Sequence, residues 1–253
     1  VNSINARIDH LIKFIKIDQS DVYLLQELKC IEEKFPKQEI EKLGYKSYVN
    51  GQKAWNGVAF LSKKPLNILN NNIPTFKEDD NARFLEAEII LEKLNKKIRL
   101  INIYLPNGNP IETSKFDYKI EWMKKFNKYI LDLYNKNIPL IIGGDFNVIP
   151  NDEDVYSPEN FKNDACAHPK TREQFRVLLN TGFTDTVKYF IEGNTNWTFW
   201  GYRGGGWQKG NGLRIDHFLT TPEVTDIIKD VKINRDPRSW EKASDHTPVI
   251  LEI

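Results

Sequence analysis

The stretch Leu140-Ile141-Ile142-Gly143-Gly144-Asp145-Phe146-Asn147 joins a short apolar run to two glycines and an acidic residue. An apolar run of this length is too short for a helix and indicates a buried strand. The strand would therefore end close to Asp145 and place a carboxylate at the edge of a sheet. Residues 21–27 repeat the arrangement, because Val22-Tyr23-Leu24-Leu25 leads into Gln26-Glu27. We predict two buried strands that each bring an acid to a sheet edge.

Helical patterns lie between and around these strands. Apolar residues at helical spacing predict a surface helix after Ser3, a short helix over about 36–43 and a long helix that ends near Asn135. The spacing of Thr171 and Gln174 is that of a capping box and predicts the start of a further helix.

Further strands and one irregular segment complete the chain. Residues 83–91 and 98–104 predict an antiparallel hairpin, and residues 213–220 and 249–253 predict two more strands. Six glycines between 201 and 212 predict a mobile surface loop without regular structure. Because strands and helices alternate without a linker or repeat, we expect residues 1–253 to form a single α/β domain of layered sheets with outer helices.

Composition narrows the class of protein. The chain has 253 residues, of which 40% are hydrophobic and 28% charged, and this excludes disordered, collagen-like and coiled-coil proteins. Lys and Arg number 36 against 35 Asp and Glu, so the net charge favours no class of partner. Two cysteines, Cys30 and Cys166, are too few for a disulfide framework. No membrane span or signal pattern is found, and we expect a cytoplasmic monomer.

Five segments place acidic or hydrogen-bonding side chains near predicted strand ends. They are Asn2, Gln26-Glu27, Asp145 with Asn147, Arg214 with Asp216, and Asp245-His246. Glu27 and Asp245 offer the carboxylates that a hard cation such as Mg²⁺ binds, with Mn²⁺ as an alternative. Asp, His and Asn side chains suit the general base and the charge-stabilising groups of phosphodiester hydrolysis.

Each segment also has a structural interpretation. Glu27 could be a solvated carboxylate, and Asp145 and Asn147 could be ordinary turn residues. Arg214 and Asp216 could form a structural ion pair. Only the run 244–248, Ser-Asp-His-Thr-Pro, favours a functional interpretation by itself, because adjacent Asp and His before a strand have no evident folding role.

Seven motifs together resemble a known family. They are VNSINAR at 1–7, LQE at 25–27, WNGVA at 55–59, YLPNG at 104–108, GGDFN at 143–147, LRIDH at 213–217 and SDH at 244–246. Their order and approximate spacing resemble those of the exonuclease III family of apurinic/apyrimidinic endonucleases, within the endonuclease/exonuclease/phosphatase superfamily. The resemblance spans essentially the whole chain and implies a four-layered α/β sandwich, with two mostly antiparallel sheets packed face to face and flanked by helices.

The resemblance implies roles for the metal-binding residues and for the base. Glu27 matches the principal metal carboxylate, Asp245 a second acid near the metal, and Asn2 a position that some relatives fill with a metal-proximal Asp. Asp145 matches the residue that orients or deprotonates the attacking water. Asn147 matches its partner, which donates a hydrogen bond to the scissile phosphate.

The remaining matched residues would contact the phosphate or orient a group that does. His246 matches a histidine on the phosphate, and Asp216 the acid that orients this imidazole. Tyr104 matches an active-site tyrosine that donates to the phosphate or acts as a phenolate, and Asn107 matches a neighbouring phosphate contact.

A second matched set would choose the substrate. Thr198-Phe199-Trp200 and Leu213 resemble an apolar pocket for a flipped-out sugar that lacks its base, which is easier to extrude than an intact nucleotide. Trp200 could equally be a core residue. The glycine-rich loop, together with Arg214, either contacts DNA phosphates or is a solvated loop without a ligand.

The resemblance implies a metal-dependent DNA phosphodiesterase of base-excision repair. It would cleave double-stranded DNA on the 5′ side of abasic sites, or act as a 3′→5′ exonuclease and 3′-phosphatase on blocked ends. Two alternatives stay open: a phosphoesterase of the same superfamily that acts on inositol phosphates or sphingomyelin, and a protein that binds DNA without cutting it. Relatives carry a strand that ends in asparagine just before the position of Val1, and we expect this first strand to be missing from the chain.

Overall fold

The computed structural model describes residues 1–253. Its helices are α1 (Ile8–Asp18), α2 (Lys37–Glu41), α3 (Ser114–Asn135), α4 (Pro169–Thr181), α5 (Thr186–Phe190), α6 (Gly206–Lys209) and α7 (Pro222–Thr225). Its strands are β1 (Val22–Gln26), β2 (Lys46–Asn50), β3 (Val58–Ser62), β4 (Asn67–Asn70), β5 (Phe84–Leu91), β6 (Lys96–Tyr104), β7 (Leu140–Asp145), β8 (Thr184–Asp185), β9 (Asp216–Thr220), β10 (Asp230–Ile233) and β11 (Val249–Glu252).

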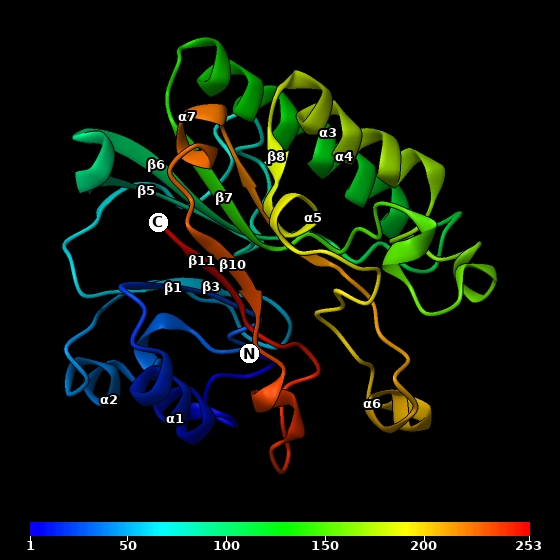
Figure 1. Ribbon diagram of the computed structural model, residues 1–253, viewed down its shortest axis with the longest axis horizontal. Coiled ribbons are helices and arrows are strands. Elements are labelled where there is room, and N and C mark those ends of the chain that lie inside the picture. The colour runs from blue at the N-terminus through cyan, green and yellow to red at the C-terminus, as the bar shows by residue number, and fades with distance from the viewer.

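Six strands form the larger sheet, in the order β4-β5-β6-β7-β9-β8. Only β6 and β7 run parallel, and the chain crosses from one to the other through the long helix α3. Figure 1 shows α3 and α4 on the outer side of this sheet. Alternate residues of the strands pack against these helices, as the cluster that contains Ile101, Ile103, Ile142, Trp122 and Phe175 shows.

The smaller sheet has the order β1-β3-β2 and is antiparallel throughout. Its central strand β3 is buried at every position, because Ala59 and Leu61 point toward α1 and α2 while Val58 and Phe60 point toward the larger sheet. Figure 1 shows α1 and α2 below this sheet, on the side away from the larger one.

A third apolar core joins the two sheets face to face. Val58 and Phe60 pack there with Leu85, Leu100 and Ile141 of the larger sheet. The β10–β11 hairpin forms a separate pair of strands beside them. Helices, sheet, sheet and helices therefore form four layers, and the predicted α/β sandwich with antiparallel and mixed sheets is confirmed (Figure 1).

Several expected elements are confirmed, within a few residues at their ends. They include the strands before Glu27 and at 140–145, the β5–β6 hairpin, and the long helix, which ends at Asn135. Strands β2, β3, β4, β8 and β10 were not predicted, and β9 begins at Asp216 rather than Leu213.

Two local predictions are wrong. Helix α4 begins at Pro169, where the His168 ring accepts a hydrogen bond from the Lys170 N–H, whereas the Thr171 hydroxyl is buried and donates to the Ala165 carbonyl. The glycine-rich loop is not devoid of regular structure, because residues 203–205 form a 3₁₀ turn that leads into α6.

No helix of the structure combines the length and the apolar character needed to cross a bilayer.

Candidate active site

Two site residues lie at the ends of strands in an unusual backbone conformation. Glu27 follows β1 with φ 54°, and Asn147 follows β7 with φ 47°. Left-handed φ values are uncommon for residues other than glycine, and such strain concentrates at functional sites. At both positions the chain turns sharply as it leaves its sheet.

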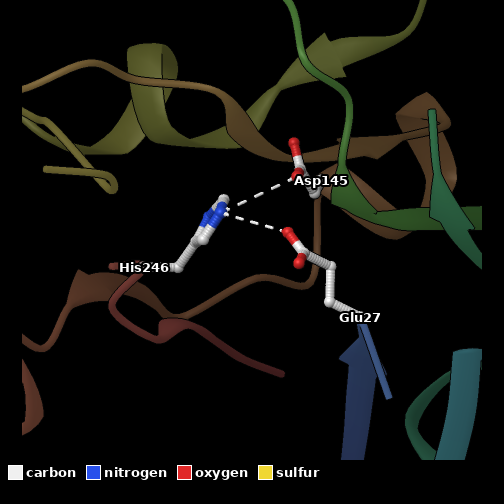
Figure 2. Close-up of side chains that lie close together, drawn as sticks. All are labelled: Glu27, Asp145 and His246. Atoms are coloured by element: carbon white, nitrogen blue, oxygen red, sulfur yellow. Dashed lines mark ion pairs between the residues drawn. The ribbon is translucent and has the colours of Figure 1, made fainter. Parts of the chain in front are cut away.

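The acids that the sequence places far apart converge here. Ligand atoms of Glu27, Asp145 and His246 all lie within 4.8 Å of one another. The Nε2 atom of His246 is 4.0 Å from Oε1 of Glu27 and 3.8 Å from Oδ2 of Asp145, as the dashed lines of Figure 2 mark. Glu27 comes from the smaller sheet, Asp145 from the larger one, and His246 from the segment before β11. The site is therefore assembled across the two sheets.

The imidazole of His246 is held by an acid on its other nitrogen. Nδ1 lies 2.9 Å from Oδ2 of Asp216, whose same oxygen accepts a 2.6 Å hydrogen bond from the Thr198 hydroxyl. Burial alone would lower the pKa of His246, but Asp216 and the neighbouring acids raise it to about 10. The ring is therefore an imidazolium at neutral pH, and Nε2 presents a proton toward the cluster.

The pKa of Asp145 is also raised, which for a carboxyl group favours the neutral form. Burial is the main cause, and with the nearby charges of Asp216 and Glu27 it outweighs His246 and raises the pKa of Asp145 to about 7. A backbone hydrogen bond of 2.9 Å from Asn147 N–H to Oδ1 fixes the carboxylate. A carboxylate with a pKa near neutrality is suited to accept a proton during a reaction.

The side-chain amide of Asn147 makes three hydrogen bonds within the protein. Its Nδ2 donates to the Leu105 carbonyl at 2.9 Å and to Oδ2 of Asp145 at 3.3 Å, and its Oδ1 accepts from Asn107 at 3.1 Å. Both amide protons thus bond inside the protein and help to hold Asp145 in place, and the donation of Asn147 to a phosphate stays a prediction. The exposed side chain at this position is Asn107.

Tyr104 lies beside the carboxylates of Glu27 and Asp145. Burial, followed by the charges of Glu27 and Asp145, raises the pKa of its phenol well above the ordinary value, although Arg83 opposes this. The guanidinium of Arg83 lies 4.9 Å from the ring centre. The raised pKa favours the protonated phenol, which can donate a hydrogen bond, and the choice between donor and phenolate stays a prediction.

The predicted metal residues Asp245 and Asn2 lie next to the cluster. Asn2 Nδ2 donates to Oδ1 of Asp245 at 3.1 Å. Burial would raise the pKa of Asp245, but His246 and Asn2 outweigh it and lower that pKa. Lys29 connects Asn2 to Glu27, because its Nζ donates to Oδ1 of Asn2 and lies 3.0 Å from Oε2 of Glu27.

The donor set fits a hard divalent cation. Glu27 and Asp145 offer carboxylate oxygens at the centre of the site, with Asp245 next to it, and these are ligands that Mg²⁺ and Mn²⁺ prefer. Buried carboxylates at such close quarters repel each other, which a cation would relieve. The protonated His246 is a poor ligand and serves better as a donor.

A cavity of about 840 Å³ adjoins the cluster. Residues of α1, β1, β6 and β11 line it, and Glu27, Asp145, Asp216 and His246 are among the other lining residues. The cluster is therefore open to a ligand, with 15% of the His246 side chain exposed.

Two residues predicted to contact substrate lie inside the protein instead. Arg214 is fully buried and forms ion pairs of 2.7 Å with both Asp154 and Asp185, so the partner suggested by sequence, Asp216, is not its partner. Trp200 is 2% exposed and packs edge-on against Trp207. Both predictions are corrected to structural roles, because neither side chain can reach a ligand.

The other two pocket residues are placed differently. Phe199 is half-buried and packs edge-on against the His246 ring, 4.9 Å between ring centres. Leu213 is buried and forms backbone hydrogen bonds with Phe199. Of Phe199, Trp200 and Leu213, only Phe199 borders the site through its side chain.

Two supporting residues, Lys29 and Lys119, were not predicted, and a third, Thr198, was predicted only as part of the substrate pocket. Lys29 and Thr198 contact Glu27 and Asp216 as described above. Lys119 of α3 is fully buried, and its Nζ donates to the carbonyls of Pro106 at 2.9 Å and Asn147 at 2.7 Å. Lys119 sits at a buried position of the α3 stripe, so a charged residue within an apolar helical face was the available signal.

Comparison with known proteins places this geometry in a family. The model of the Endonuclease/Exonuclease/phosphatase family matches residues 1–246. Exodeoxyribonuclease III of Haemophilus influenzae is 33% identical over 260 residues, which cover all of this chain and 97% of that protein. The 3′ phosphatase NExo from Neisseria, solved with a product DNA hairpin, superposes with a TM-score of 0.94 at 32% identity, covering 100% of this chain and 96% of that one. An AP endonuclease from Archaeoglobus fulgidus gives a TM-score of 0.92 at 30% identity, with 100% and 97% covered. The chain belongs to the Endonuclease/Exonuclease/phosphatase family, and its homologues include exodeoxyribonuclease III and AP endonucleases.

Proposed function

We propose that the protein is a divalent-metal-dependent DNA phosphodiesterase of base-excision repair, which cuts double-stranded DNA on the 5′ side of abasic sites and processes 3′ ends as exonuclease and 3′-phosphatase. The observation that carries the proposal is the convergence of Glu27, Asp145 and His246 within 4.8 Å, with Asp216 behind the imidazole. The homologues are nucleases, and one structural neighbour holds a DNA hairpin.

The residues divide the chemistry between them. Asp145, with its pKa near 7, orients the attacking water and accepts its proton. His246, Tyr104 and Asn107 present hydrogen-bond donors to the phosphate oxygens, on which negative charge builds up as the water attacks. Asp216 keeps the imidazole charged and aimed, and Asn147 keeps Asp145 in place.

Glu27 would hold Mg²⁺ or Mn²⁺, with an oxygen of Asp145 within reach of the same ion and with Asp245 and Asn2 at its side. When bound, the cation supplies positive charge that offsets charge on the phosphate and the leaving oxygen. Lys29 lies 3.0 Å from Glu27 and keeps this carboxylate paired when no cation is there.

Phe199 supports the choice of an abasic substrate. Its half-buried ring packs against His246 and offers an apolar surface beside the reacting centre. A sugar without a base needs no base-edge partner and loses little stacking when it leaves the duplex. All of the site residues named above come from one chain, which supports a monomer, and two buried free cysteines agree with the cytoplasm.

A duplex oligonucleotide with one tetrahydrofuran site tests the proposal. With Mg²⁺ we expect a single cut on the 5′ side that leaves a 3′-hydroxyl, and EDTA should abolish it. Equal cleavage of an intact duplex, or full activity in EDTA, contradicts the proposal. A duplex with a 3′-phosphate and an inositol polyphosphate serve as parallel substrates, and faster phosphate release from the inositol compound would favour that alternative.

The Asp145→Asn variant provides the matched control. It keeps the shape of the side chain but removes the proton acceptor, so cleavage should fall by at least about 10²-fold while abasic duplex still binds. Binding without cleavage by the unsubstituted protein would support the non-catalytic alternative. Unchanged cleavage by the variant would overturn the role of Asp145.

A further inference from the structure

The candidate site is divided between two sheets that touch mainly through apolar side chains. Glu27 follows β1 of the smaller sheet, whereas Asp145 ends β7 of the larger one. Apolar packing is non-directional. It therefore holds the sheets together without fixing how far one slides along the other, and the spacing of the two carboxylates needs a directional contact.

Asn102 of β6 makes such a contact. Leu100 belongs to the core between the sheets while Ile101 and Ile103 belong to the core under α3, so the alternation of the strand points Asn102 at the smaller sheet. The residue is fully buried. A polar side chain in this core is costly unless it is hydrogen-bonded.

All hydrogen bonds of the Asn102 side chain are made with residues of the smaller sheet. Asn102 Nδ2 donates to the carbonyls of Leu25 at 3.0 Å and Ala59 at 2.9 Å, and Oδ1 accepts from Gln26 Nε2 at 2.7 Å. The two carbonyls can only accept, which fixes the orientation of the amide. One side chain is thus bonded to β1 and β3 together.

These contacts lie next to the site on both sides. Leu25 and Gln26 directly precede Glu27. Asn102 is two residues before Tyr104 on the same face of β6, and it pairs with Gly143 of β7, two residues before Asp145. A shift of the sheets at Asn102 would therefore be transmitted to Glu27 and Asp145 within one or two residues of rigid strand.

We infer that Asn102, with Gln26, is a positioning residue that sets the spacing between Glu27 and Asp145 and thereby the affinity of the site for a divalent cation. The inference rests on the proposed function. Asn102 touches no substrate and acts only through the strands that carry the two acids.

The test measures cation binding directly, by the EPR signal of free Mn²⁺, together with the unfolding temperature and abasic-site cleavage. Asn102→Leu keeps the number and branching of the side-chain heavy atoms and removes all three bonds. We expect Mn²⁺ to bind about 10- to 100-fold more weakly, as is usual when a residue that orients metal ligands is lost. Gln26→Met removes the Gln26–Asn102 bond at the half-buried edge of the core and should weaken binding in the same direction by less.

Asn127→Leu is the matched control. Asn127 is a buried asparagine of α3 that donates to the Gln174 carbonyl of α4 at 2.9 Å, between a helix pair outside the sheets. Its loss should lower the unfolding temperature as much as Asn102→Leu does and leave Mn²⁺ affinity unchanged.

The outcomes separate the two claims. Wild-type affinity in both Asn102→Leu and Gln26→Met, or an equal loss in Asn127→Leu, overturns the positioning role. If Asn102→Leu does not fold, Gln26→Met decides. If the wild type binds Mn²⁺ in an Asn102-dependent way but does not cut abasic DNA, the proposed function fails and the inference stands.

Discussion

His246 Nδ1 lies 2.9 Å from Oδ2 of Asp216 and 3.1 Å from Oδ1, so both oxygens of one carboxylate face one ring nitrogen. Asp216 begins β9, and the hydroxyl of Thr198 fixes it in turn. Burial favours a neutral ring, yet the acids hold the pKa of His246 at about 10. Asp216 is the first of the causes that raise it.

Asp216→Asn should make cleavage both slower and more sensitive to base. Without the carboxylate the pKa of His246 falls, and the imidazolium is lost as pH rises through that lower value. The alkaline limb of the kcat/KM profile should move to lower pH, and kcat should fall by about 10²- to 10⁴-fold. Steady-state rates on the abasic duplex from pH 6 to 10 measure both effects.

Thr198→Val gives a graded comparison for this prediction. It removes the 2.6 Å hydrogen bond to Asp216 and keeps the carboxylate. We expect a smaller loss of kcat and a smaller shift of the alkaline limb. A pH profile of Asp216→Asn that coincides with that of the wild type would contradict the role assigned to Asp216.

The Arg214→Met variant tests whether Arg214 stabilises the fold rather than contacting the substrate. Arg214→Met leaves the buried carboxylates of Asp154 and Asp185 without their partner, which should lower the free energy of unfolding by about 3–5 kcal/mol. The KM of the folded variant for abasic duplex should be unchanged, because the guanidinium faces the interior. Denaturant titration and cleavage kinetics on the same preparation measure the two quantities.

Arg203 is the exposed counterpart for the Arg214 experiment. It lies in the 3₁₀ turn at 203–205 and is solvent-exposed, with no hydrogen bond or ion pair in the structure. Arg203→Met should leave unfolding unchanged and raise KM if the loop contacts DNA phosphates. A raised KM with normal stability in Arg214→Met would restore Arg214 as a substrate contact.

The sequence predicts most parts of the fold that have a local pattern, but not β3, whose buried apolar run at 58–61 has the same pattern and was not predicted. The strands before Glu27 and Asp145 are short apolar runs at buried positions, and the α3 stripe repeats at helical spacing. Strands β2 and β4 lack such a signal, because they contain several polar residues and are partly exposed. Their pairing with β3 and β5 stabilises them, and that pairing is a property of the tertiary fold.

The site residues could be identified from the motifs, but their contacts could not. Arg214 has Asp216 two residues away, yet it pairs with Asp154, 60 residues distant. Arg214 lies before the start of β9 and is buried against Asp154, whereas Asp216 begins the strand and bonds to His246. Asn102 has no local signal either, since an asparagine inside an apolar strand gains its partners only when two sheets meet. Spacing along the chain carries no information on such contacts.

His217 makes the stability of the fold depend on pH. The ring is buried next to Arg214, and burial first and then Arg214 lower the pKa of His217. Arg214 Nη1, which can only donate, lies 2.9 Å from Nδ1, and Nε2 lies 3.0 Å from the Val148 carbonyl, so the ring is neutral with its proton on Nε2. A second proton on Nδ1 would face the guanidinium.

This geometry predicts lower stability as pH falls below about 6.5, the ordinary pKa of histidine. The unfolded chain binds a proton in this range and the folded chain does not, so the free energy of unfolding rises with pH and His217 contributes up to about 1.4 kcal/mol per pH unit. His217→Gln should be less stable at pH 8, because the ring packs against Phe146 and Phe175, but its stability should decline less between pH 6.5 and 5. Urea unfolding of both proteins at pH 5, 6.5 and 8 measures the two slopes. Parallel slopes would mean that His217 takes up its proton inside the folded protein, and the neutral ring beside Arg214 would then be wrong.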